Sequence, residues 1–353
     1  MSAVWEQNVR RVVPYVAGEQ PTDTNIIKLN TNENPYGPSP KVQELADHMD
    51  SDIFKKYPDQ TAGDLVRALA KYHGFKPEEI FVGVGSDDVL AMCFMTFFNS
   101  DKEILFPNIT YSFYPVWAEM LRIKYRTVPL DEQFNIRPED YKAPNGGIIF
   151  PNPNAPTAIL ASREVVEDII ASNRDSIVIV DEAYIDFAAE GSSVVDLTRK
   201  YDNLIVVRTY SKSRSMAGLR IGYAIANEKL IKYINDVKYS YNSYTMNTPS
   251  IILGTASVED DEYFKEKIEA IKKTREWFTE ELKKLGFKVL PSSANFVFAS
   301  PKTKTAAEVF EAAKQAGIYV RYFKAPLTKD FLRITIGLDE EMKKVVDFLK
   351  GFC

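Results

Sequence analysis

Residues 204–223 read LIVVRTYSKSRSMAGLRIGY, and the rest of the chain is organised around this stretch. It begins as a continuous apolar run, which is typical of a strand buried on both faces of a sheet. Hydroxyl side chains, a single lysine at position 212 and a small-residue loop with an arginine follow, and then a second strand. Burying an ammonium group without a partner is costly, so a lysine directly after a buried strand calls for an explanation. Lys212 is therefore the first candidate for chemistry.

The chain outside this stretch alternates between apolar runs and segments with helical spacing. Further strands are predicted at 80–84, 103–106, 147–150 and 176–180, and a helix at 162–171. This alternation predicts an α/β fold with a mostly parallel, doubly wound sheet. Sheets of this type bind ligands at the carboxyl ends of their strands, so polar residues at those ends are the candidate site residues.

The length of 353 residues allows two domains. Residues 1–40 are rich in proline and predict an N-terminal arm that joins the smaller domain. Residues 41–240 contain the predicted sheet and are expected to form a large domain. Residues 241–353 begin with a long charged helix at 261–285 and predict a smaller α+β domain.

Composition excludes several functional classes. The formal net charge of −5 argues against a nucleic-acid or membrane-surface partner, because Lys and Arg are not in excess. Two cysteines (Cys93, Cys353) and two histidines (His48, His73) make a disulfide framework and a metal site unexpected. The first residues lack the pattern of a signal peptide, and no apolar run reaches the length of a bilayer span. We therefore expect a cytoplasmic protein without a metal.

Two strand ends carry residues suited to an anion and a flat ring. The sequence GVGSD at 83–87 has glycines that allow close backbone approach, and Ser86 is expected to cap a helix whose N-terminus attracts an anion. Tyr111, which follows the strand at 103–106, could stack on a flat ring. Taken alone, the glycine turn is explained equally well as a structural helix cap, and Tyr111 is explained better as an ordinary core or surface tyrosine.

Two further strand ends offer polar side chains. The loop PNPNAPTA at 151–158 is rigid and presents amides, Asn154 among them. Asp181 ends an apolar run, so its carboxylate needs a cationic or donor partner. An arginine would suffice, but a protonated pyridine nitrogen fits as well, and Tyr184 could reach a phenolate oxygen on the same ring.

Lys212 itself lies among donors that suit a phosphate dianion, namely Thr209, Ser211 and Arg220. A lysine near arginines is expected to have a lowered pKa, as Schiff-base chemistry requires. The ordered set of Asp, Tyr, Ser-Lys and Arg matches what one phosphorylated pyridine aldehyde needs, and this favours a cofactor site over a solvated lysine.

With these residues, the sequence resembles the fold-type I, pyridoxal-phosphate-dependent aminotransferases over essentially its whole length. Within that family it is most similar to the histidinol-phosphate aminotransferases. The motifs that carry the resemblance are VPY at 13–15, LNTNENP at 29–35, KYPD at 56–59, GVGSD at 83–87, DEAY at 181–184, SK at 211–212 with AGLRIGY at 217–223, and LRITIG at 332–337.

The resemblance implies pyridoxal 5′-phosphate as the cofactor and assigns catalytic roles. Lys212 would hold the cofactor covalently and move a proton at the substrate Cα. Asp181 would keep the pyridine nitrogen protonated, so that the ring withdraws electrons. Tyr184 would donate to the ring O3′, and Tyr111 would stack on the ring.

The resemblance also implies how the phosphate and the second subunit take part. Tyr57 would reach the phosphate from the neighbouring subunit, which predicts a homodimer with shared active sites. The other phosphate contacts implied are Ser86, Asp87, Thr209, Ser211 and Arg220.

For the substrates, the resemblance implies an amino transfer between L-histidinol phosphate and 2-oxoglutarate. The products would be imidazole-acetol phosphate and L-glutamate, by a ping-pong reaction in histidine biosynthesis. Arg333 would bind the substrate carboxylate and Arg321 a second anion, with Tyr15 from the arm and Asn32 completing the substrate site. Strand-end salt bridges are the structural alternative for the two arginines.

Two loops depart from the family pattern. Family members read Asn-Asn-Pro-Thr-Gly in the third loop, whereas this chain has Ala155 and Ala158 at the second Asn and the Gly. Either Asn154 replaces the missing amide or Tyr184 acts alone. Arg214, after Lys212, stands where small apolar residues are usual, and it could lower the pKa of the lysine or bind a carboxylate elsewhere.

Other functions remain open from the sequence. A lyase similar to the threonine-phosphate decarboxylases would share the same Lys, Asp, Tyr and Arg. An aromatic-amino-acid aminotransferase would need no phosphate site near Arg321. A non-catalytic regulator that binds the cofactor is a third possibility, although no DNA-binding module accompanies the fold.

Overall fold

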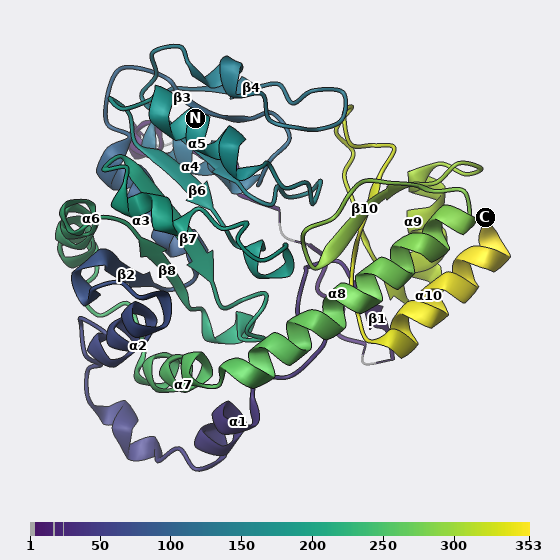
Figure 1. Ribbon diagram of the computed structural model, residues 1–353, viewed down its shortest axis with the longest axis horizontal. Helices are drawn as coiled ribbons and strands as arrows, with labels where there is room; N and C mark the ends of the chain where they lie inside the picture. Colours follow the sequence, from purple (N-terminus) through teal and green to yellow (C-terminus); the bar gives the residue numbers. More distant parts are fainter. Residues whose placement is uncertain (1–3, 17, 24) are drawn as a thin grey trace.

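The computed structural model describes residues 4–16, 18–23 and 25–353 (Figure 1). Positions 1–3, 17 and 24 belong to the predicted arm and lie outside the described residues. The chain forms a large sheet flanked by helices and a second, smaller group of strands and helices, and α8 (Asp261–Lys284) runs from one to the other (Figure 1).

The large sheet has seven strands, and most of its pairs are parallel. β8 is antiparallel to both of its neighbours, whereas the pairs from β7 to β4 are all parallel. The predicted doubly wound, mostly parallel α/β sheet is therefore confirmed, although β4 was not predicted. The strand order is β2 (Ile80–Gly83), β8 (Gly222–Ile225), β7 (Leu204–Thr209), β6 (Val178–Asp181), β5 (Gly147–Pro151), β3 (Ile104–Pro107) and β4 (Tyr125–Val128).

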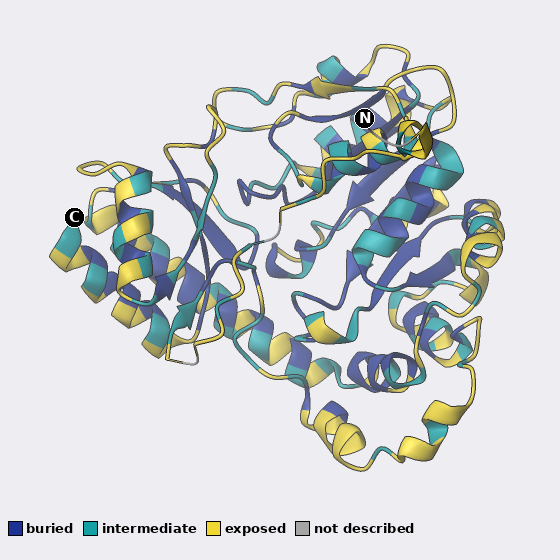
Figure 2. Ribbon diagram, turned by 180° about the vertical axis from the view of Figure 1, so that it is seen from behind, coloured by how far each residue is buried: buried dark blue, intermediate teal, exposed yellow. Residues whose placement is uncertain are grey.

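Helices cover both faces of this sheet, which explains why its strands are continuous apolar runs. In β7, Ile205 packs into the cluster under one layer of helices, and Leu204 packs into the cluster under the other. Figure 2 shows the strands buried between helices that expose only their outer sides. The first layer has α3 (Ser86–Phe97), α4 (Phe113–Leu121) and α6 (Glu228–Tyr241), and the second has α2 (Gly63–His73), α5 (Arg163–Ser172) and α7 (Thr248–Glu259).

The smaller group is built on a four-stranded antiparallel sheet. Its order is β12 (Arg321–Tyr322), β13 (Leu332–Thr335), β10 (Phe296–Ser300) and β9 (Lys288–Val289). It packs in one core with α8, with α9 (Ala306–Gln315) and with α10 (Asp339–Phe352).

The early chain joins this smaller group. β1 (Ile27–Lys28) pairs in parallel with β11 (Ile318–Tyr319). β11 and β12 follow each other closely in the chain but belong to different sheets. The remaining elements are α1 (Pro40–Asp47) and the short 3-10 helices η1 (Val4–Asn8), η2 (Ser51–Lys55), η3 (Pro77–Glu79), η4 (Pro138–Tyr141), η5 (Ile185–Phe187), η6 (Val195–Arg199) and η7 (Ala217–Leu219).

Parallel pairing brings the ends of β5, β6 and β7 to one edge of the large sheet. Pro151 of β5 lies opposite Asp181 of β6, and Asp181 lies opposite Val207 of β7. Polar residues that are far apart in sequence therefore meet at this edge. Among the helices of the described residues, none is both long enough and apolar enough to cross a bilayer.

Candidate active site

Two adjoining cavities lie at this edge, and Lys212 lines both of them. The first has a volume of about 170 Å³ and the second about 130 Å³. All the site residues predicted from the sequence line one or both cavities, apart from Asn154 and Tyr57. The first is lined by Ser86, Asp87, Tyr111, Asp181, Tyr184, Thr209, Ser211, Lys212 and Arg220, and the second adds Tyr15, Asn32, Arg321 and Arg333.

Asp181 is the buried carboxylate of the first cavity. Tyr114 Oη donates to its Oδ2 at 3.1 Å, and the Ala183 N–H donates to Oδ1 at 3.1 Å. Burial raises the pKa of Asp181 to about 7, although the hydrogen bonds from Tyr114 and Ala183 oppose the rise. The arginine next to it, Arg208, binds Glu182 instead. The carboxylate of Asp181 is thus suited to a proton or to a protonated ring nitrogen.

An anion cradle lies at the start of α3. Ser86 was expected to be the cap, but Gly85, with φ 85°, is the N-cap residue and has no side chain to occupy the free N–H groups. A Cβ on Gly222 would lie 2.3 Å from the Ser86 nitrogen, so only glycine permits this close approach. The start of α3 is therefore left open to an anion.

Arg220 supplies the charge of this cradle. Its Nη2 lies 3.2 Å from Asp87 Oδ2, and its Nη1 donates to Ser211 Oγ at 3.5 Å. Ser211 Oγ in turn accepts a hydrogen bond from Thr209 Oγ1 at 3.0 Å. A guanidinium, two hydroxyls and a helix N-terminus together match a phosphate dianion.

Lys212 lies between this cradle and the second cavity. Its Nζ donates to the Thr31 carbonyl at 3.2 Å and lies 5.8 Å from the centre of the Tyr184 ring. Tyr184 Oη accepts a hydrogen bond from Asn32 Nδ2 at 2.9 Å, and Thr335 Oγ1 donates to Asn32 Oδ1 at 3.0 Å. Asn32 thus orients Tyr184 beside the lysine.

Arg321 and Arg333 lie opposite each other on β12 and β13. Arg333 Nη2 donates to the Asn30 carbonyl at 2.8 Å, and its buried Nε has no partner within the described residues. Burial and the charge of Arg321 lower the pKa of Arg333. Two neighbouring guanidinium groups favour an anionic ligand in the second cavity. Tyr15 also lines this cavity and stacks on Phe113 at a centroid distance of 4.1 Å.

The structure does not bring Asn154 to the first cavity. Its Nδ2 donates to the Ile109 carbonyl and to Thr157 Oγ1, both at 3.0 Å, and Ala155 lines the cavity in its place. Of the two alternatives for the missing family Asn, the geometry favours Tyr184 acting alone.

Tyr57 also lies away from both cavities. Its side chain is 83% exposed and stacks on Tyr244 at 4.8 Å. No contact within a single subunit therefore links Tyr57 to the anion cradle in the described part of the chain.

Arg214 takes neither of the positions expected from the sequence. Its Nη1 donates to the Ser257 carbonyl at 2.6 Å, so the partner is not a carboxylate. Its Cζ lies 4.0 Å from the Phe264 ring centre and within 6 Å of the Tyr72 and Tyr210 rings. The guanidinium is held by aromatic faces rather than directed at Lys212.

Sequence reasoning missed Tyr114, which contacts Asp181 directly. The signal was present, because Tyr114 follows Tyr111 by three residues, and a buried tyrosine normally finds a partner for its hydroxyl. Thr31 and Phe323 were also missed, although both line the second cavity. Nothing in the local sequence distinguishes Phe323 from a core residue.

The polar groups of the first cavity fit pyridoxal phosphate. A buried carboxylate suits the ring nitrogen, a tyrosine suits the ring hydroxyl, an open helix N-terminus with Arg220 suits the phosphate, and Lys212 suits the aldehyde. The unpaired Nε of Arg333 adds a site for a substrate anion in the adjoining cavity.

Comparison with known proteins agrees with this reading of the site. Residues 24–349 match the family model described as aminotransferase class I and II, and the chain belongs to this family. A relative from Lactococcus lactis, named histidinol-phosphate aminotransferase, is 48% identical over 99% of this chain and 96% of its own.

Solved structures give the same result. The histidinol-phosphate aminotransferase from Clostridium acetobutylicum is 26% identical, with a TM-score of 0.85 over 92% of this chain and 98% of its own. The one from Sinorhizobium meliloti, in complex with pyridoxal 5′-phosphate, shares the fold at 22% identity, with a TM-score of 0.84 over 93% and 92% of the two chains.

Proposed function

We propose that the protein transfers an amino group between L-histidinol phosphate and 2-oxoglutarate with pyridoxal phosphate as cofactor. The products are imidazole-acetol phosphate and L-glutamate. The observation that carries the proposal is the position of Lys212, which lines both the cavity with Asp181 and the cavity with the two arginines. The names of full-length relatives support the choice of substrate.

When bound, pyridoxal phosphate supplies an aldehyde that condenses with amines and a ring that withdraws electrons. In this chain, Lys212 holds the aldehyde end and moves a proton at the substrate Cα. Asp181 holds the ring nitrogen in its protonated form, because a buried carboxylate favours a cationic partner. Tyr184, oriented by Asn32, donates to the ring hydroxyl.

The remaining cavity residues bind and orient the two ligands. Ser86 and Asp87 hold the cofactor phosphate largely through backbone N–H groups, together with Thr209, Ser211 and Arg220. Tyr111, whose hydroxyl donates to Asp87 at 2.8 Å, covers the ring. In the second cavity, Arg333 binds the carboxylate of glutamate, and Arg321 with Tyr15 binds the phosphate of histidinol phosphate. The two amino donors thus occupy the same cavity in turn.

We also propose a homodimer in the cytoplasm, in which Tyr57 contacts the phosphate in the site of the partner subunit. The exposure of Tyr57 and its distance from the site of its own chain support this arrangement. The two cysteines are unpaired, which is compatible with a reducing compartment.

A screen of the first half-reaction tests this function. The holoenzyme is mixed separately with histidinol phosphate, glutamate, phenylalanine and O-phosphothreonine, and the visible absorbance of the cofactor is followed. We expect histidinol phosphate and glutamate to convert it to the amino form. Carbon dioxide release from O-phosphothreonine would indicate a decarboxylase instead, and conversion by phenylalanine alone would indicate an aromatic aminotransferase.

A further inference from the structure

We propose that Ser213, Arg214 and Asn34 form a positioning device, here called the lysine clamp, that fixes the backbone around Lys212 and thereby the place of its ammonium group. The inference deepens the proposed function and rests on it. None of the three clamp residues lines either cavity. They act on the reaction only through Lys212.

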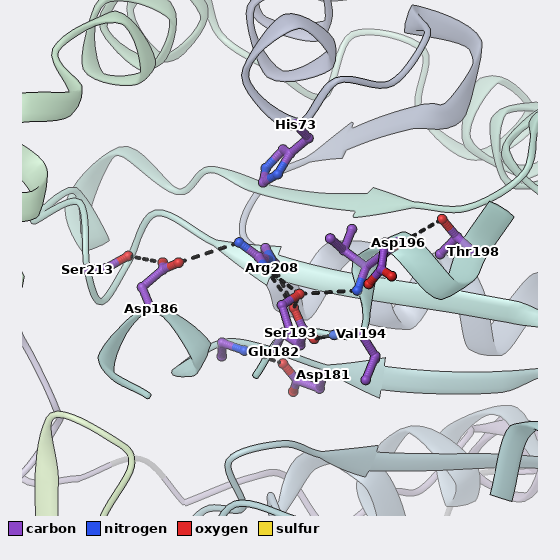
Figure 3. A network of polar contacts seen from close by, with 12 residues as sticks. His73, Asp181, Glu182, Asp186, Ser193, Val194, Asp196, Thr198, Arg208 and Ser213 are labelled. Atoms are coloured by element: carbon purple, nitrogen blue, oxygen red, sulfur yellow. Dashed lines mark hydrogen bonds and ion pairs between the residues drawn. The ribbon is translucent and has the colours of Figure 1, made fainter. Parts of the chain in front are cut away.

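Ser213 connects the loop that carries Lys212 to η5 and, through Asp186, to β7. Its side chain is 3% exposed, and its Oγ donates to Asp186 Oδ2 at 2.6 Å (Figure 3). Asp186 lies in η5, directly after the DEAY motif, and its Oδ1 accepts from Arg208 Nη1 at 3.4 Å. One carboxylate thus joins the loop after β7 to a residue within β7.

Arg208 extends the connection to the residue next to Asp181. Its Nε and Nη2 donate to Glu182 Oε2 at 3.0 and 2.9 Å, and Nη2 also donates to Ser193 Oγ at 2.7 Å (Figure 3). Asp181 lines the first cavity, whereas Glu182, the next residue, contacts Arg208. The same buried network therefore sets the positions of both Asp181 and the Lys212 loop.

Arg214 and Asn34 hold the loop from other directions. Arg214 donates to the Ser257 carbonyl in α7 and lies over the Phe264 ring in α8. Asn34 Nδ2 donates to the carbonyls of Lys212 and Ser213, both at 3.0 Å. Asn34 thus holds the backbone carbonyls of Lys212 and Ser213, and the side chains of Ser213 and Arg214 anchor the same loop in other directions.

This fixation matters because a lysine side chain is long and has many rotamers. A reacting amine must stay within a few tenths of an ångström of its productive position, and a displacement of about 1 Å can cost roughly 10²-fold in rate. The network around Ser213 restricts the backbone at Lys212, so that only the side-chain torsions of Lys212 remain to be ordered.

The test compares holoenzymes of Ser213→Ala and of Ser176→Ala. Ser176 is a matched control, because its hydroxyl also donates a hydrogen bond, to the Asn145 carbonyl at 2.9 Å, but lies just before the opposite end of β6. We expect Ser213→Ala to lower the single-turnover rate with glutamate by about tenfold, with the Kd for glutamate within about twofold. The midpoint of the pH titration of the visible absorbance should also move, whereas Ser176→Ala changes none of the three quantities.

A double-mutant cycle identifies the contact. If Ser213 acts through Asp186, Ser213→Ala combined with Asp186→Ala will be no slower than Asp186→Ala alone, because both variants remove the same hydrogen bond. Additive losses would overturn the inference, as would a Ser213→Ala enzyme with wild-type titration and rate. A wild-type protein without a cofactor absorbance band would instead contradict the proposed function, so the two failures are distinguishable.

Discussion

Two consecutive carboxylates at the end of β6 have opposite environments. Glu182 pairs with the guanidinium of Arg208, whereas the described residues give Asp181 only a tyrosine hydroxyl and one backbone N–H. The difference follows from strand geometry, since neighbouring side chains point to opposite faces of the sheet. Burial therefore favours the protonated form of Asp181 until a cationic ligand stabilises the carboxylate.

This imbalance predicts how the stability of the cofactor-free protein depends on pH. The pKa of Asp181 is about 7 in the folded chain, against 3.8 without burial. Between these values the folded state keeps a proton that the unfolded state has lost, so the contribution of Asp181 declines as the pH rises from 4 to 7. The wild type should lose up to about 4 kcal/mol of unfolding free energy from this group between pH 4 and pH 7. We expect Asp181→Asn to be free of this loss.

Urea unfolding of the cofactor-free wild type and variant at pH 5 and pH 8 measures the effect. The wild type should lose stability relative to Asp181→Asn at the higher pH, and saturating pyridoxal phosphate should restore it. Parallel pH profiles for the two proteins would show that Asp181 is not buried in the form described here.

At the scale of the elements, the strand ends were predictable and the loops between them were not. Continuous apolar runs identify β2, β3, β5, β6 and β7, and topology then places their ends together. The short strand β4 escaped prediction because two of its four residues are exposed, which removes the apolar run.

The orientation of the Asn154 side chain also could not be predicted from the sequence. Whether its side chain faces the cavity depends on the path of the loop, and the loop turns it toward Ile109 and Thr157. Tyr114 and the partners of Ser213 are likewise contacts between distant segments, with separations of 67 and 27 residues, which no local pattern encodes.

His73, at the end of α2, is a half-buried titratable group with a testable consequence. Burial and the charges of Arg208 and Arg214 lower its pKa from 6.5 to about 2, and its Nε2 lies 3.0 Å from Tyr223 Oη. The unfolded chain takes up a proton below pH 6.5 that the folded chain does not. The free energy of unfolding therefore decreases as the pH is lowered below 6.5. The loss amounts to about 2 kcal/mol at pH 5.

Replacing this group should flatten the acid side of the stability profile. We expect His73→Gln to lose about 2 kcal/mol less than the wild type between pH 7.5 and pH 5, as measured by chemical denaturation. His48→Gln serves as the control, since His48 is exposed. An identical pH dependence for His73→Gln and the wild type would contradict the burial of this imidazole.

At the scale of the whole molecule, the arm and the smaller group complete the second cavity. Tyr15 and Asn32 come from the early chain, and Arg321 and Arg333 come from strands near the C-terminus. The sequence indicated these residues through resemblance, but not the pairing of β1 with β11 that brings the early chain to the smaller group. Pairing between segments almost 300 residues apart depends on the global fold and leaves little trace in local sequence.

The shared-site homodimer predicts complementation between inactive subunits. Subunits with Lys212→Ala lack the reacting amine, and subunits with Tyr57→Ala lack the proposed contact across the interface. In a mixed dimer, one site carries both defects and the other carries neither. Co-expressed variants should therefore exceed the mean activity of the two homodimers, whereas activity equal to that mean would contradict a shared site.

The central claim is that the lysine at the end of β7 holds the cofactor. The most direct measurement is borohydride reduction of the protein with pyridoxal phosphate, followed by digestion and mass spectrometry of the peptides. The account predicts a pyridoxyl group on Lys212 alone, and its absence after Lys212→Ala. A label on another lysine, or a wild-type protein without any label, would contradict it.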